Sequence, residues 1–150
     1  MELWRSLNPE SDAVATGLNA LAEAKKAAGD WDGAEGDYLE ALRIARKIGD
    51  REGIATYTGN LAELALDRHD WPAAERLATE ALALAVGIGR LELIASDHHS
   101  LALALLKQQR VAEALPYARE AVAIYTQLRI PNLSAAEATL AECEAACSSV

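Results

Sequence analysis

The side chains best suited to chemistry in this sequence are the adjacent residues Asp97, His98 and His99, and two cysteines, Cys143 and Cys147. Imidazole, carboxylate and thiolate groups are the usual protein ligands of zinc. Adjacent helical residues, however, point about 100° apart, whereas histidine pairs that bind zinc on a helix are spaced four residues apart. The cysteines have that spacing but no companion ligands in the nearby sequence. We therefore expect no metal site, and interpret these residues as helix surface and core.

Catalytic signatures are also missing from the sequence. There is no glycine-rich phosphate loop and no G-x-S-x-G elbow. Carboxylates are plentiful, but Glu40, Glu80 and Glu120 recur every 40 residues, which is typical of a solvated face rather than of an acid–base pair. We expect no catalytic residues and no cofactor, so the protein is predicted not to be an enzyme.

The composition favours closely packed helices. The chain has 150 residues, suited to a single domain, and 51% of them are apolar although it contains no Phe and only 5% aromatics. Ala and Leu therefore dominate the apolar content, and both are strong helix formers. The net charge is −9 with no basic cluster, which disfavours nucleic acid. No secretion signal or membrane-length apolar run is present, and two cysteines are too few for a disulfide framework. We expect a cytoplasmic protein with no membrane partner.

The sequence repeats itself every 40 residues. Residues 11–50 and 51–90 share 15 identities at this offset, and residues 51–90 and 91–130 share 11. A fixed period of this size indicates stacked supersecondary units, none of which can bury its apolar face alone. We predict three units, 11–50, 51–90 and 91–130, within one domain that spans residues 1–150.

Each unit is expected to contain two helices. In the second unit, apolar residues recur at helical spacing from residue 54 to residue 66, and His69-Asp70 interrupts them. Asp70 is a good N-cap and Pro72 suits a first turn, where its missing N–H costs little. Gly49 and Gly89 are expected to end the second helices in a left-handed conformation. In the third unit Pro131 is expected to supply the stop, and Pro116 to distort the first turns of its helix.

Small residues at equivalent positions should set the distance between helices. They are Ala22, Ala62 and Ala102, Ala34, Ala74 and Ala114, and Ala41, Ala81 and Ala121. Alanines allow antiparallel backbones to approach closely, and a larger side chain there typically costs about 1 to 3 kcal/mol. Trp31 and Trp71 are expected to fill the space at the turn between the two helices.

These residues resemble the tetratricopeptide repeat (TPR) family. The second unit matches its pattern at Leu61, Ala62, Trp71, Ala74, Ala78, Ala81 and Leu82. The first unit supplies Leu21, Ala22, Trp31, Ala34, Tyr38, Ala41 and Leu42, and the third Leu101, Ala102, Val111, Ala114, Ala118, Ala121 and Val122. The period of 40 exceeds the usual 34 of the family. The resemblance implies an all-α, right-handed α-solenoid of three helix pairs.

Both ends of the solenoid need covering. Beyond Pro131, Leu133, Ala136, Leu140, Cys143 and Cys147 fall on one helical face, so we predict a seventh, capping helix over residues 132–147. At the other end, residues 1–10, with Trp4 and Leu7, are expected to form an N-terminal cap.

The family resemblance also implies a concave groove, lined by the first helix of each pair, that holds a partner protein. Carried over position by position, the groove residues are Thr16, Asn19, Glu23, Lys26, Thr56, Glu63, Leu66, Asp67, Ser96, His99, Leu103, Leu106 and Lys107. Leu66, Leu103 and Leu106 would then be exposed, and a partner segment or the seventh helix would cover them. Alternatively, the helix phase is off by one residue and these leucines belong to the core.

These observations predict a non-catalytic scaffold that binds a peptide or helix of a partner protein. One alternative is a small TPR-type chaperone that holds an apolar client segment and forms a homodimer. Another is a sensory or regulatory fragment of a larger signalling protein. The sequence does not name the partner.

Overall fold

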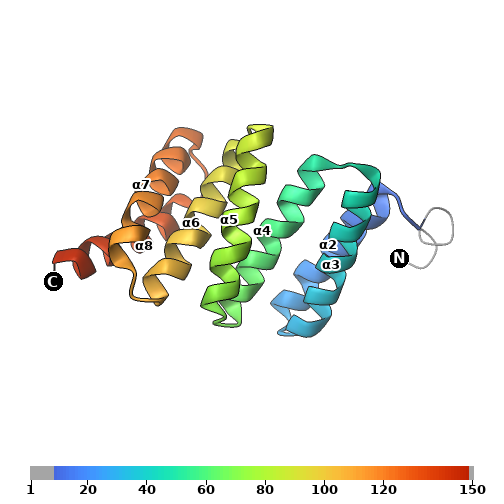
Figure 1. The fold of residues 1–150 in the computed structure, drawn as a ribbon, viewed down its shortest axis with the longest axis horizontal. Coiled ribbons are helices and arrows are strands. Elements are labelled where there is room, and N and C mark those ends of the chain that lie inside the picture. Colours follow the sequence, from blue (N-terminus) through green and yellow to red (C-terminus); the bar gives the residue numbers. More distant parts are fainter. Residues whose placement is uncertain (1–8, 149–150) are drawn as a thin grey trace.

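The computed structural model describes residues 9–148, which form seven α-helices and no strand. The helices are α2 (Asp12–Ala27), α3 (Trp31–Ile48), α4 (Arg51–Asp67), α5 (Trp71–Ile88), α6 (Leu91–Lys107), α7 (Val111–Leu128) and α8 (Leu133–Ser148). They stand side by side along one long axis, with the two ends of the chain at opposite ends of the stack (Figure 1). The predicted all-α solenoid is confirmed. Trp4 and Leu7 lie outside the described residues.

Aspartates begin the helices of the first two units. The side chains of Asp30, Asp50 and Asp70 each accept a hydrogen bond from the backbone N–H three residues later, at 3.0, 3.0 and 3.3 Å. Each bond satisfies a backbone donor that has no partner within the helix. In the third unit the equivalent positions are Arg90 and Arg110, and neither side chain caps its helix.

Left-handed residues end the second helix of every pair. Gly49 and Gly89 have φ of 74° and 72°, a conformation that glycine adopts without steric cost. In the third unit Arg129 takes this conformation, with φ of 56°. The expectation that Pro131 alone supplies the stop was therefore wrong, because Arg129 already turns the chain two residues earlier. Pro116 lies inside α7, and the helix continues through it from Val111 to Leu128.

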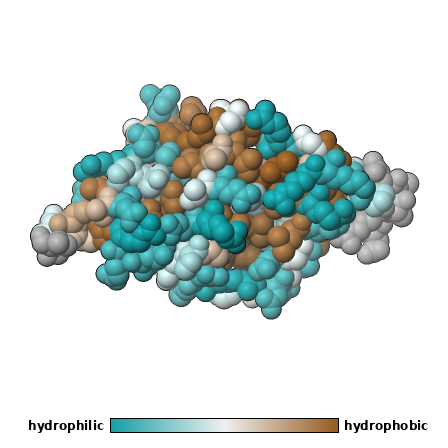
Figure 2. Space-filling model, viewed as in Figure 1, coloured by the Kyte–Doolittle hydropathy of each residue, from teal (hydrophilic) through white to brown (hydrophobic). Residues whose placement is uncertain are grey.

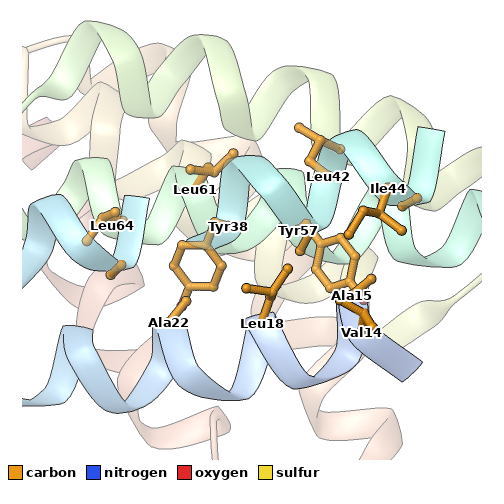
Figure 3. Close-up of a cluster of buried hydrophobic side chains, with 13 residues drawn as sticks. Val14, Ala15, Leu18, Ala22, Tyr38, Leu42, Ile44, Tyr57, Leu61 and Leu64 are labelled. Carbon is orange, nitrogen blue, oxygen red and sulfur yellow. The ribbon is translucent and has the colours of Figure 1, made fainter. Parts of the chain in front are cut away.

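Alanines hold the two helices of each pair together. All nine repeat-equivalent alanines that the sequence singles out have no exposed surface. Around them, larger side chains fill the space, and the close-up of the first unit shows Tyr38 of α3 pointing toward Ala22 of α2 (Figure 3). Tyr38 is fully buried, whereas Trp31 is 40% exposed. Trp31 therefore does not fill the turn as expected, and Tyr38 is the aromatic anchor of that pair.

The last helix covers the end of the stack. Helix α8 packs on α7 and also contacts α6. Its buried residues are Ala136, Thr139 and Cys143, spaced three and four residues apart on one face. Cys143 contributes to the same apolar cluster as Leu101 and Leu105 of α6. The bounds of α8 lie one residue beyond the predicted range of 132–147.

Candidate partner-binding face

The first helices of the three pairs, α2, α4 and α6, form one continuous face, because α4 contacts both α2 and α6. We call it the α2–α4–α6 face. Its larger part near the C-terminal end is a pocket of about 240 Å³, the C-terminal pocket. The lining residues of this pocket are Lys26, Glu63, Leu66, Asp67, Ser96, His99, Ser100, Leu103, Tyr125 and Asn132.

A second hollow lies on the same helices nearer the N-terminus. This N-terminal pocket has a volume of about 470 Å³ and is shallower and more polar. It is lined by Asp12, Thr16, Asn19, Asp50, Glu52, Gly53, Thr56 and Tyr57. Three of its lining side chains are alcohols or amides and three are carboxylates, so hydrogen bonding rather than apolar burial is what this pocket offers.

Most of the residues predicted for the groove line one of these two pockets. The C-terminal pocket brings together Lys26, Glu63, Leu66, Asp67, Ser96, His99 and Leu103. Thr16, Asn19 and Thr56 line the N-terminal pocket. Glu23, Leu106 and Lys107 line neither of them.

A polar network joins the three helices across the face. The ammonium group of Lys26 on α2 lies 3.3 Å from Oε2 of Glu63 on α4. The hydroxyl of Ser96 on α6 donates to the other carboxylate oxygen of Glu63 at 3.2 Å. Glu63 is therefore shared by its two neighbours, and this network fixes the spacing of the helices at the C-terminal pocket.

Two further hydrogen bonds connect the helices toward the N-terminus. The side-chain amide of Asn60 on α4 donates to Oδ1 of Asn19 on α2 at 2.7 Å. Glu23 accepts a hydrogen bond from the hydroxyl of Tyr38. Burial and then this hydrogen bond raise the pKa of Tyr38 far above its usual value. Glu23 therefore anchors the tyrosine of the core instead of lining a pocket.

The three leucines expected in the groove are half-buried and not fully exposed. Leu66 packs against the buried alanines Ala65, Ala74 and Ala104. Leu106 packs against the cluster that contains Cys143 of α8. The expectation of three exposed leucines was wrong, because α8 and the neighbouring repeat cover part of each side chain. Leu66 and Leu103 still present surface to the C-terminal pocket.

The adjacent histidines face different surroundings, as expected from their positions on a helix. Nε2 of His99 lies 2.8 Å from the hydroxyl of Thr139 on α8, and the ring of His98 packs on Tyr117 of α7. Burial lowers the pKa of both histidines, which favours neutral rings. Within residues 9–148, no group of three or more His, Cys, Asp or Glu side chains could hold a metal ion.

Sequence reasoning missed three residues of the C-terminal pocket: Ser100, Tyr125 and Asn132. Tyr125 belongs to α7, a second helix, and Asn132 lies between α7 and α8. Neither occupies a groove position of the repeat pattern. Their contribution depends on how the last pair and α8 close over the end of the face, which the 40-residue pattern does not encode.

No helix in the described part of the chain is long and apolar enough to cross a membrane.

The protein resembles solved structures along nearly its whole length. BtubC (BKLC) from P. vanneervenii superposes with a TM-score of 0.78 at 24% identity, covering 89% of this chain and 56% of BtubC. This chain therefore spans just over half the length of that relative. Two structures of the kinesin light chain nearly identical TPR-like repeats from Podosopora anserina give TM-scores of 0.76 and 0.74. These two are 22% and 20% identical, cover 97% and 98% of this chain, and are covered to 72% and 74% of their own length.

These structural matches, all at low identity, show a shared fold. No curated protein matches the sequence. A family model described as tetratricopeptide repeat matches residues 1–85, more than half of the 150-residue chain, and a second of the same description matches residues 99–128. The chain belongs to the tetratricopeptide repeat family.

Proposed function

We propose that this protein is a non-catalytic scaffold that binds a segment of a partner protein across the α2–α4–α6 face. Membership of the TPR family supports a role in protein–protein interaction, and the TPR fold is typically non-catalytic. The observation that carries the proposal is the convergence of seven predicted groove residues, from three different helices, on the C-terminal pocket.

The C-terminal pocket offers an apolar anchor point beside hydrogen-bonding groups. Leu66 and Leu103 contribute apolar surface, and Ser100, Tyr125 and Asn132 carry polar groups beside them. A side chain such as leucine or methionine would be buried against the two leucines, while the polar groups would bind the partner's backbone.

Charge on this face favours a partner segment that carries basic residues. Glu63 and Lys26 neutralise each other, whereas Asp12 and Asp67 have no ion-pair partner within residues 9–148. Each of these two carboxylates lines one of the pockets. A lysine or arginine near each end of the bound segment would pair with them, at the modest energy of exposed ion pairs.

Photo-crosslinking tests this proposal. A photoreactive benzoylphenylalanine replaces Thr56, which lines the N-terminal pocket, or Thr79, which is exposed on α5. After exposure to the lysate of a cell that expresses the protein, mass spectrometry identifies the crosslinked proteins. We expect one partner to crosslink from position 56 and not from position 79. Equal crosslinking from both positions would place the partner elsewhere.

A further inference from the structure

A larger cavity lies on the other side of the molecule, between the second helices of the first two pairs. This α3–α5 cleft has a volume of about 390 Å³. Its apolar lining includes Leu42 of α3, Leu61 and Leu64 of α4, and Leu77 of α5. Figure 2, drawn from the same side as Figure 1, shows hydrophobic surface bordered by hydrophilic residues where α3, α4 and α5 meet. The wall residue Leu39 is 48% exposed.

The repeat itself explains why this cleft is open. Thr58, Ala65 and Leu77 line it, and the residues 40 positions later are His98, Leu105 and Tyr117. Each of the three is larger in the later copy. At that second junction the rings of His98 and Tyr117 pack together with their centres 5.7 Å apart. The space that these rings fill between the second and third units is therefore empty between the first and second.

Ion pairs close the two ends of the cleft. Arg46 of α3 lies 3.7 Å from Glu80 of α5 at one end, and Arg68 of α4 lies 3.4 Å from Glu35 of α3 at the other. Along α3, the distance from Glu35 to Arg46 corresponds to about 16 Å, or three helical turns. Arg76, on the α5 wall, has no ion-pair partner within residues 9–148. The unbalanced charge of this cleft is therefore positive.

We infer that the α3–α5 cleft is a docking site for an amphipathic helix of a partner protein, about three turns long, with leucine-like residues on one face and a carboxylate directed at Arg76. A helix fits because α3, α4 and α5 use their backbone groups internally and offer none to an extended strand. The apolar face of such a helix would cover Leu39 and the leucines of the floor. This site is separate from the α2–α4–α6 face and does not depend on it.

Matched peptides and a filled cleft test this inference. The probe is a synthetic helical peptide of about 14 residues, with leucines at positions 3, 6, 7 and 10 and glutamates on the opposite face. In T58H/L77Y, residues of the second junction fill the cleft. Because binding depends on the open apolar floor, we expect this variant to bind the peptide at least about tenfold more weakly, by fluorescence anisotropy. L66D, on the α2–α4–α6 face, is expected to bind the peptide as the wild type does.

Two surface changes keep the test informative if the filled variant folds poorly. Leu39→Lys alters an exposed wall residue and is also expected to weaken binding. Arg76→Glu is expected to weaken binding of the glutamate peptide about threefold while leaving a lysine counterpart unaffected or improved. Unchanged binding to both T58H/L77Y and Leu39→Lys would overturn the inference. So would stronger binding of the lysine peptide to the wild type, or a dimer in sedimentation velocity that T58H/L77Y abolishes, since a second copy would then be the occupant.

Discussion

Asp97 is the residue whose chemistry contrasts most with its surroundings. It is only 3% exposed, and its Oδ2 atom has no hydrogen-bond partner in the described structure. It lies against α4 at Gly59, where an added Cβ would be 3.0 Å from Oδ1. Burial, with a smaller contribution from Glu63 of α4, raises the pKa of Asp97 to about 8. The side chain is therefore mostly protonated at neutral pH.

The raised pKa predicts a pH-dependent stability. The folded protein holds this proton more tightly than the unfolded chain, in which the pKa is near 3.8. The free energy of unfolding therefore falls as the pH rises from about 4 to about 8, at most by roughly 1 kcal/mol per pH unit. Asp97→Asn is expected to remove this slope and to be more stable than the wild type at pH 8. Urea unfolding at several pH values measures it, with the exposed Glu92→Gln as control. A slope that persists in Asp97→Asn contradicts the account.

The buried alanines predict a second effect at the scale of single residues. Ala81 on α5 has no exposed surface, whereas Ala83, two residues later, is exposed. Ala81→Leu is expected to lower the free energy of unfolding by about 1 to 3 kcal/mol, because the added atoms have no space between the helices. Ala83→Leu is expected to change it by less than about 1 kcal/mol. Equal effects in denaturant unfolding would show that the alanine does not set the helix spacing.

The sequence predicts buried alanines better than it predicts groove leucines. Each alanine recurs at an offset of 40 residues and contacts the partner helix of its own pair, so the repeat pattern identifies it. The exposure of Leu106 depends on the cluster around Cys143, in a helix that lies outside the three repeats. Such a contact is set by tertiary packing alone.

At the scale of helices, aspartate caps distinguish the first two units from the third. Asp50 caps α4 through a hydrogen bond of 3.0 Å to the N–H of Gly53, whereas Arg90, at the equivalent position, makes no side-chain cap. Asp50→Ala is expected to destabilise the protein by about 1 kcal/mol. Arg90→Ala, which removes an exposed ion pair with Glu52, is expected to cost less. Thermal unfolding compares the two, and an equal or larger loss for Arg90→Ala contradicts this assignment.

Helix α8 provides a test of the covered end. Ala136 is 1% exposed against α7, and its neighbour Ala135 is exposed. Ala136→Arg is expected to detach α8, because a buried charge without a partner is costly, and to speed amide hydrogen exchange in α7 and α8. Ala135→Arg should leave exchange unchanged. If both variants exchange like the wild type, α8 does not depend on this contact.

Helix starts could be predicted from the sequence, whereas one helix end could not. Aspartate before Trp31 and Trp71 is a recognisable cap, and Gly49 and Gly89 are recognisable stops. Arg129 occupies the left-handed region although arginine rarely does. The chain must turn there to bring Leu133 against α7, where Leu133 packs with Tyr125. That requirement comes from the docking of α8, and the local sequence does not reveal it.

At the scale of the whole molecule, stacking leaves two faces with different chemistry. The first helices present polar pockets that a hydrogen-bond network holds in register, through Glu63 with Lys26 and Ser96. The second helices leave an apolar cleft where the first junction lacks the rings of His98 and Tyr117. The solenoid and the positions of ten groove residues could be predicted from the repeat. The cleft could not, because it reflects side chains that the copies do not share.

The central claim is that the α2–α4–α6 face binds the partner, and the affinity of the crosslinked partner segment tests it most directly. Calorimetric titration gives the Kd for the wild type and for Leu66→Asp combined with Leu103→Asp, with circular dichroism to verify the fold. Because both leucines line the C-terminal pocket, we predict a Kd at least about tenfold higher for the double variant. A correctly folded double variant that binds the segment with unchanged Kd would contradict the claim.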